Sequence, residues 1–294
     1  MGVTTAHPPM RTCSLIVHAD DFGLSGRVNA GILSAHRQGI LTSTSLVACG
    51  SAVDEAIELA RSAPDLDVGV HLTLIAERPI LPAETIPTLT NQEGRFLGSA
   101  GAFMKRLLGR GVSLGEVHRE LDAQISYLVE HGVRISHLDG HQHLHMAPGI
   151  RSVVGELARK WRVPAIRYPA ESVRPYMVKD PRHWGRVVEL LVLNSFCRRA
   201  PADDAVRPDH FVGFYFGGRL SKRNLLTALA RLPSRGTCEL MCHPGLSDPE
   251  SPYLSWNYHW QEEHDALTDP DVAGFLRDRG VALISYRDLL VPGR

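Results

Sequence analysis

Short apolar runs alternate with longer stretches of helical spacing along most of this chain of 294 residues. The first apolar run, residues 14–18, precedes apolar positions at three-to-four spacing over residues 28–38, which Gly39 ends. Repetition of this pattern predicts a mostly parallel sheet covered by helices. The predicted strands are residues 14–18, 43–48, 67–71, 134–138, 164–167, 239–241 and 281–285, and the predicted helices are residues 28–38, 52–62 and 116–131.

Polar side chains come directly after several of these apolar runs. In parallel α/β folds the loops at the carboxyl ends of the strands converge on one face, where catalytic residues collect. Five separate placements of this kind are hard to attribute to chance, so we expect one site at that face. The residues that follow the rule are Asp20 with Asp21, His71, His141, Arg167 and His243.

The chain is longer than most single domains, and its length is usual for one domain only when the fold is a barrel. We expect a single α/β domain over residues 1–294, without internal repeats. Residues 171–211 have weak periodicity and scattered prolines, which indicates a long excursion from the core.

The amino-acid composition limits which binding partners and which cellular compartment we expect for this protein. The 32 basic and 32 acidic residues balance, which argues against a long-range attraction to nucleic acid or to an anionic membrane. Five cysteines in a long chain favour a reducing compartment over a disulfide framework. The sequence has no apolar run of about 18 residues, so we expect a cytoplasmic protein without stable membrane insertion.

The densest signal is the motif His137-Leu-Asp-Gly-His-Gln-His-Leu-His145. If the motif is extended, every second side chain shares one face, which would carry four His and one Asp. If the chain turns helical after Gly140, His141 and His145 pair one turn apart. A solvated surface loop is the plain alternative, but the preceding apolar run and the following Pro148-Gly149 favour a buried strand end. Several converging imidazoles predict a metal site.

Asp20 and Asp21 follow a buried apolar run, where two uncompensated carboxylates would be costly. They therefore need a metal, a hydrogen-bond donor or a proton. Because the chain turns at a strand end, one can bind a metal while the other acts as a base; an Asx-turn or helix cap is the structural alternative. His71 ends another strand and offers a second imidazole, although a core histidine would look the same. Imidazole and carboxylate ligands suit a divalent first-row ion.

His243 follows the apolar run of residues 239–241 and is placed at the same face. Imidazole has a pKa that can be tuned near neutrality, which fits a general acid for a leaving amine; a structural turn histidine is the alternative. Other catalytic motifs are missing from the sequence, including the Gly-x-Ser-x-Gly elbow, the phosphate-binding loop and the Rossmann glycine pattern. The hydroxyl-rich residues 42–45 are explained by β-propensity.

At these residues the sequence resembles the YdjC-like deacetylase family, which includes chitooligosaccharide and hopanoid-glycan deacetylases. The resemblance implies a distorted (β/α) TIM-like barrel, one divalent ion bound by an Asp and two His, and hydrolysis of an N-acetyl group on an amino-sugar carbohydrate or glycolipid. Residues 171–211 resemble neither branch closely. The matching motifs are His18-Ala-Asp-Asp-Phe-Gly-Leu-Ser25, Gly39-Ile-Leu-Thr-Ser-Thr-Ser45, Val68-Gly-Val-His-Leu72, His137-Leu-Asp-Gly-His-Gln-His-Leu-His145, Glu239-Leu-Met-Cys-His-Pro-Gly245 and Ser285-Tyr-Arg-Asp288.

Carried over position by position, the resemblance makes Asp21, His71 and His141 the metal ligands. Asp20 then takes the place of the base that accepts the proton of water, and His243 that of the acid that protonates the amine. The ligand set by itself favours Zn²⁺, whereas the family implies Mg²⁺ equally often. The sequence therefore predicts one divalent ion, Mg²⁺ or Zn²⁺.

Five further residues are expected on the substrate side of the site. Trp256 and Trp260 suit stacking on the apolar face of a sugar ring, with core packing as the alternative. His143 and His145 are the next candidates for proton donation. Arg167 either orients the base or lies on the surface.

Two other classes of function stay open. A metal-dependent phosphoesterase uses similar ligands, but it typically bridges two ions and needs basic residues for phosphate. A non-catalytic sugar- or metal-binding module would not need a second carboxylate beside the metal ligand. The expected partner is an N-acetylated sugar, and a homodimer is compatible with the sequence.

Overall fold

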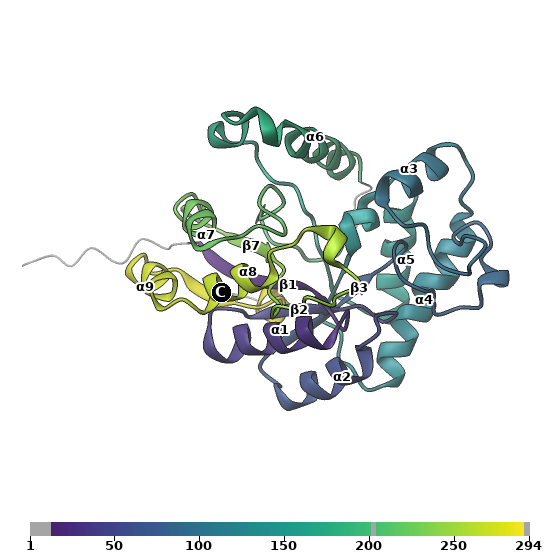
Figure 1. The fold of residues 1–294 in the computed structure, drawn as a ribbon, viewed down its shortest axis with the longest axis horizontal. Coiled ribbons are helices and arrows are strands. Elements are labelled where there is room, and N and C mark those ends of the chain that lie inside the picture. The colour runs from purple at the N-terminus through teal and green to yellow at the C-terminus, as the bar shows by residue number, and fades with distance from the viewer. Residues whose placement is uncertain (1–12, 201–203, 291–294) are drawn as a thin grey trace, which may run out of the picture.

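The computed structural model describes residues 13–200 and 204–290, and a parallel sheet forms the centre of this part of the chain (Figure 1). The pairs between named strands are all parallel, as the alternation of strands and helices predicts. The strands are β1 (Ser14–Phe22), β2 (Ser43–Leu46), β3 (Asp67–Leu72), β4 (His137–Gly140), β5 (Ala165–Ile166), β6 (His210–Val212), β7 (Thr237–Cys242) and β8 (Ala282–Ile284).

The sheet curls toward closure. Its strands follow the order β5-β4-β3-β2-β1-β7-β6, and β8 pairs with the first residues of β1. At the two ends of this order, Ala165 of β5 forms a parallel bridge to Val206, which precedes β6 along the chain. The bridge brings the outer strands together, and the predicted distorted (β/α) barrel is confirmed.

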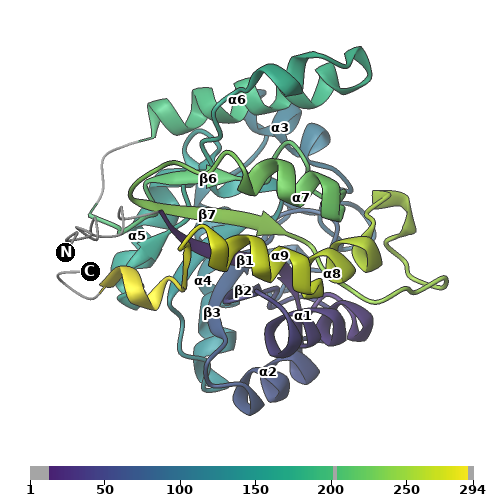
Figure 2. The same cartoon turned by 90° about the vertical axis from the view of Figure 1, so that its left-hand side faces the viewer.

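Helices surround the sheet (Figures 1 and 2). The first helix ends before Gly39, as the sequence predicts. It begins after Ser25, two residues before the predicted start at residue 28, and the hydroxyl of Ser25 accepts the N–H of Val28. Within residues 13–200 and 204–290, the helices are all too short or too polar to cross a membrane. They are α1 (Gly26–Gln38), α2 (Val53–Ser62), α3 (Ala100–Leu108), α4 (Leu114–Glu130), α5 (Ile150–Trp161), α6 (Trp184–Arg199), α7 (Lys222–Leu229), α8 (Trp260–Thr268) and α9 (Pro270–Asp278).

The two faces of strand β1 have different surroundings, one apolar and the other largely polar. Leu15 and Val17 belong to the large apolar cluster between the sheet and its helices. The alternate residues Ile16, His18 and Asp20 point to the other face, inside the barrel, where many polar side chains are buried. Buried charge must be paired, so the barrel interior requires a network of partners.

The His-rich motif does not continue as a strand. β4 starts at His137, so the strand predicted over residues 134–138 is displaced toward the motif. After Gly140 the chain forms a 3₁₀ turn, η2 (His141–Met146), in which Gln142 and His143 have positive φ angles of 47° and 56°. Left-handed backbone interrupts both an extended row and a regular helix. Both geometries considered for the motif are therefore wrong, and its imidazoles point to different surroundings.

The excursion predicted over residues 171–211 contains a regular helix, α6, that the sequence analysis did not predict. Its apolar residues lie on several sides, because Leu190 and Leu193 are buried whereas Val188 and Leu191 are exposed. Such a distribution leaves no 3.6-residue pattern to detect. Figure 1 shows α6 standing apart from the helices that cover the sheet.

Helix α1 touches the loop after β7 at two glycines. A Cβ atom placed on Gly31 would lie 2.3 Å from the Cα of Gly245. The missing side chain therefore lets the backbone of α1 approach this loop, which carries His243 two residues earlier.

We expect Gly31→Ala to destabilise the protein by roughly 1–3 kcal/mol, because the loop after β7 must move to admit a methyl group. Gly274→Ala in α9 is the matched control, since a Cβ atom there meets only a side-chain atom of Arg277 at 3.8 Å. The control should stabilise the helix by up to about 1 kcal/mol, the intrinsic advantage of Ala over Gly. Urea unfolding measures both, and changes of the same sign would contradict the close approach.

Candidate metal centre and active site

The two aspartates at the end of β1 reach neighbouring positions at the mouth of the barrel. Successive strand residues normally point to opposite faces. Asp21, however, has a φ of 69°, a left-handed conformation that Asp tolerates better than most residues. Both side chains are buried, with 4% of Asp20 and 1% of Asp21 exposed. The turn at the strand end thus delivers two carboxylates side by side.

The structure brings together the three residues predicted as metal ligands, Asp21, His71 and His141, which we call the three-ligand group. Asp21 Oδ1 lies 3.1 Å from Nδ1 of His141 and 3.4 Å from Nε2 of His71. One possible ligand atom from each residue lies within 4.8 Å of the others. Asp21 Oδ2 and His141 Nε2 are buried without a hydrogen-bond partner among the described residues. Unsatisfied lone pairs of this kind fit a divalent cation.

His71 is oriented from behind by a carboxylate. Its Nδ1 lies 2.9 Å from Asp139 Oδ1 and 3.2 Å from the hydroxyl of Ser45, which leaves Nε2 facing Asp21. Burial by itself lowers the pKa of His71, but the charges of Asp139 and Asp20 outweigh it and raise the pKa to about 9. A negative field that favours a protonated imidazole also favours a bound cation, and a carboxylate behind a ligating histidine is a common arrangement in metal sites.

Arg167 is fully buried, so the alternative of a surface residue is wrong. Its two terminal nitrogens bond both oxygens of Asp20 at 2.7 and 2.9 Å, and its Nε bonds Glu239 at 2.7 Å. Nη1 also lies 2.9 Å from Asp139 Oδ2. Burial by itself raises the pKa of Asp20, but Arg167 and His71 outweigh it and lower the pKa to about 2. Asp20 is therefore ionised and held in one orientation.

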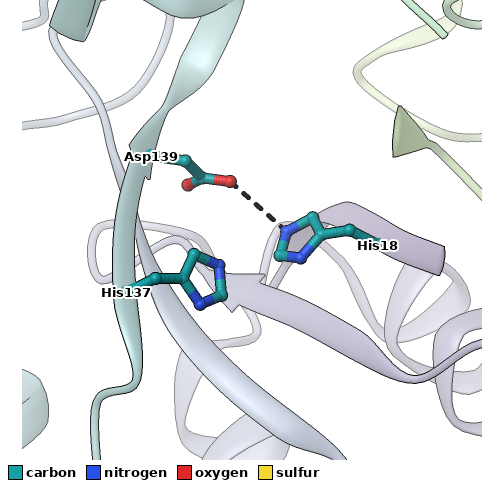
Figure 3. A group of neighbouring side chains, drawn as sticks. All are labelled: His18, His137 and Asp139. Carbon is teal, nitrogen blue, oxygen red and sulfur yellow. Dashed lines mark ion pairs between the residues drawn. The ribbon is translucent and has the colours of Figure 1, made fainter. Parts of the chain in front are cut away.

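A second group of metal-ligand types lies deeper in the barrel (Figure 3). His18 Nε2 lies 3.3 Å from Asp139 Oδ2, and its Nδ1 lies 3.0 Å from the hydroxyl of Ser43. His137 is stacked on Tyr286 with ring centroids 3.9 Å apart. A cation here would meet the guanidinium already paired with the same Asp139 oxygen. This group therefore serves as support for the residues at the mouth.

His243 follows β7 and lies beside Asp20. Its Nε2 is 3.9 Å from Asp20 Oδ2, and its ring packs on Tyr258 with centroids 4.7 Å apart. The backbone N–H of His243 donates to Glu263 Oε2 at 2.5 Å, which ties the loop to α8. Burial lowers the pKa of His243, although Asp20 and Asp21 oppose this shift. The imidazole predicted as the acid thus faces the carboxylate predicted as the base.

A cavity of about 530 Å³ opens onto these groups. Asp20, His141, His143 and His243 line it together with residues of α3 and α6. Arg167 is not among the lining residues, so its guanidinium supports Asp20 rather than contacting a ligand. Of the three-ligand group, His141 lines this cavity, so a substrate bound there can approach the group.

The other predicted substrate residues lie in different surroundings. His145 is buried and its Nε2 donates to the backbone carbonyl of Arg167, with burial lowering the pKa of the imidazole to about 3. Trp256 packs against His141, with ring centroids 4.9 Å apart. Trp260 is buried in the apolar core, which is the core-packing alternative. Neither His145 nor Trp260 is therefore placed to contact a substrate directly in this structure.

Several supporting residues escaped the sequence analysis. Ser45 was explained by β-propensity, yet its hydroxyl donates to Asp139 at 2.9 Å. Asp139 itself stands opposite His71 in the pairing of β3 with β4, so the strand register would have indicated this contact. Glu263 and Tyr258 carry no motif, and only the packing of α8 and its preceding loop brings them to His243.

A parallel barrel that presents an Asp and two His at its mouth, beside a second carboxylate and an imidazole, defines a candidate metal-dependent hydrolase. The model of the family described as YdjC-like protein matches residues 14–278. This chain belongs to the YdjC-like family, which confirms the resemblance of its motifs.

Relatives match over nearly their whole length. A carbohydrate deacetylase from Geobacillus stearothermophilus is 34% identical, and the match covers 93% of this chain and 96% of that protein. A chitooligosaccharide deacetylase from Serratia marcescens is 30% identical, with 94% and 98% covered. A protein of solved structure from Enterococcus faecalis, whose name describes it as a candidate cellobiose-phosphate cleavage protein, is 30% identical to this chain. It superimposes with a TM-score of 0.73 and covers 95% of this chain and 100% of its own.

We expect His71→Ala and His141→Ala each to lose most of the bound metal, because removing one of three protein ligands opens the site. His131→Ala, at an exposed position after α4, is the matched control and should keep its metal. Metal content after dialysis, measured by mass spectrometry, gives the result, with circular dichroism to check folding. Stoichiometric metal in both His71→Ala and His141→Ala would show that the ion is held elsewhere.

Proposed function

We propose that this protein is a metal-dependent hydrolase that removes an N-acetyl group from an amino sugar in a carbohydrate or glycolipid. One observation carries the proposal: the carboxylate of Asp20, held by Arg167, lies 3.9 Å from the imidazole of His243, beside the three-ligand group. The names of the deacetylase relatives support it.

The three-ligand group would hold one divalent ion, Mg²⁺ or Zn²⁺. Two imidazoles favour Zn²⁺ on chemical grounds, and a carboxylate suits either ion. A divalent cation bound there supplies a Lewis acid, which polarises an acyl carbonyl and lowers the pKa of a water molecule. Three protein ligands leave coordination positions open for such groups.

Asp20 accepts a proton from water in this proposal. Its pKa of about 2 keeps the carboxylate ionised at neutral pH, and Arg167 fixes its direction. The same ion pair weakens Asp20 as a base, so orientation rather than basicity is its main contribution. A fixed carboxylate at the cavity wall can take the proton without first changing its own position.

His243 donates a proton to the leaving amine. It lines the cavity and lies beside Asp20, directly after β7. Burial lowers the pKa of the imidazole, which makes its protonated form a stronger acid. Amines leave poorly unless they are protonated, so a donor at this position serves amide hydrolysis. A phosphoesterase is less well supported, since Arg186 is the one Arg or Lys among the cavity-lining residues.

Asp20→Asn keeps the shape of the side chain and removes the proton acceptor. We expect kcat for acetate release from a panel of N-acetylated sugars to fall by about 10²-fold or more, with metal content unchanged. Asp278→Asn, at an exposed position in α9, is the matched control. Loss of metal from Asp20→Asn would mean that Asp20 rather than Asp21 is the ligand. If the metal-loaded wild type released no acetate from any sugar in the panel, the proposed function would be wrong.

His243→Ala should keep its metal and bind substrate nearly normally, yet lose roughly 10²- to 10⁴-fold in kcat. A general acid works in its protonated form, so activity falls as pH rises through its pKa, and this alkaline limb should move or vanish in the variant. The measurement is the pH profile of kcat/KM for wild type and variant. An unchanged alkaline limb would transfer the role of donor to another group, with His143 next because it also lines the cavity.

A further inference from the structure

The loop that carries His243 is held by a buried carboxylate. Glu263 lies in the first turn of α8, and its side chain is fully buried. Its Oε2 accepts the backbone N–H of His243 at 2.5 Å, and its Oε1 accepts the backbone N–H of Leu220 at 3.0 Å. One carboxylate thus joins α8 both to the loop after β7 and to the segment that leads into α7.

The charge of Glu263 is balanced by these two N–H groups rather than by a cation. No ion pair to Glu263 forms within residues 13–200 and 204–290, and Asp20 and Glu262 add further negative charge nearby. Burial raises the pKa of Glu263 to about 7, although the two N–H groups oppose the shift. Burying a carboxylate without a cation is costly. An amide side chain has a single acceptor oxygen, so it cannot accept both N–H groups as the carboxylate does.

The imidazole of His243 has little else to orient it. Its Nδ1 is buried without a hydrogen-bond partner in the part of the chain that the structure describes. Its Nε2 lies 3.9 Å from Asp20 Oδ2, which is beyond hydrogen-bond distance. The ring packs on Tyr258 with centroids 4.7 Å apart. The direction of the imidazole therefore depends on this packing and on the position of its backbone, which Glu263 fixes.

The rest of the loop has attachments of its own. Gly245 donates its N–H to the carbonyl of Trp260 at 3.1 Å, and the next residue donates its N–H to a carbonyl of α1 at 3.0 Å. These bonds hold the loop two and three residues beyond His243. Glu263 makes the contact at His243 itself, so its loss would free the imidazole without detaching the whole loop.

We propose that Glu263 is a positioning residue for the proposed general acid, because its carboxylate holds the backbone of His243 so that the imidazole stays beside Asp20. The inference rests on the proposed function and adds a residue to it. Glu263 does not line the cavity, so it acts through His243 rather than on a substrate. The two proposed catalytic groups are then held differently: Arg167 bonds the side chain of Asp20, whereas Glu263 bonds the backbone of His243.

Glu263→Gln tests the role, because its NH₂ group would oppose one of the two N–H groups. We expect kcat for acetate release by the metal-loaded full chain to fall by about 10- to 10²-fold, with KM changed by less than about twofold, since a displacement of about 1 Å can have this effect. The metal content should stay unchanged. An unchanged kcat would overturn the proposal.

Glu116→Gln is the matched control. Glu116 is also buried in the first turn of a helix, α4, and it accepts the backbone N–H of Thr88 at 2.7 Å. Neither residue lines the cavity. The control should therefore lose stability without losing kcat, and an equal loss of kcat in both variants would overturn a specific role for Glu263.

A double-variant cycle separates positioning from general destabilisation. If Glu263 acts through His243, Glu263→Gln should lower kcat no further in a His243→Ala background, because the group that it positions is already missing. A purely structural role would lower kcat by the same factor in both backgrounds. That result would overturn the proposal.

Nuclear magnetic resonance makes the test independent of turnover. The rings of His243 and Tyr258 are close enough for a nuclear Overhauser effect in the metal-loaded protein, which should be lost in Glu263→Gln and kept in Glu116→Gln. If the wild type releases no acetate, the proposed function fails, and this measurement still decides whether Glu263 holds His243. If circular dichroism shows that Glu263→Gln is unfolded, Glu263→Asp replaces it, since Asp keeps the charge but is one CH₂ group too short to reach both N–H groups. A ring contact retained in the folded variant would overturn the proposal.

Discussion

The buried guanidinium of Arg167 is the constraint on which the interior of this barrel depends. It pairs with Asp20 from β1, Asp139 from β4 and Glu239 from β7, and so links three strands to the end of β5. Removing one partner from a buried ion pair typically costs about 3–5 kcal/mol, because the other charge is left uncompensated. Loss of any one of these partners is therefore expected to destabilise the fold as well as the site.

Arg167 orients other residues of the site through two carboxylates, those of Asp20 and Asp139. Asp20 receives its fixed orientation and low pKa directly from the guanidinium. Asp139 shares one oxygen with Arg167 and gives the other to His71, which turns the free nitrogen of His71 toward Asp21. One cation thus positions both the proposed base and, through a carboxylate, a proposed metal ligand. The two functions cannot be adjusted independently, since a shift of either carboxylate disturbs the pairing of the other.

Much of this arrangement could be predicted from the sequence, because strand ends and ligand types are local signals. The placement of Asp20, His71 and His243 at one face followed from the rule for parallel sheets. The conformation after Gly140 could not be predicted, since it depends on left-handed residues, Gln142 among them, that the surrounding contacts impose. Helix α6 escaped because apolar residues occupy both its packed side and its cavity side, which removes the periodicity that reveals a helix.

The bridge between Ala165 and Val206 has an evolutionary consequence. It holds together the two points between which the chain leaves the barrel to form α6 and then returns. A segment whose ends already meet can be lengthened, shortened or exchanged without disturbing the sheet beneath it. The paired charges inside the barrel therefore constrain substitution there, whereas the segment that starts and ends at this bridge can change in length and in sequence. Grafting the same segment from a relative is the natural way to give this scaffold a new ligand preference.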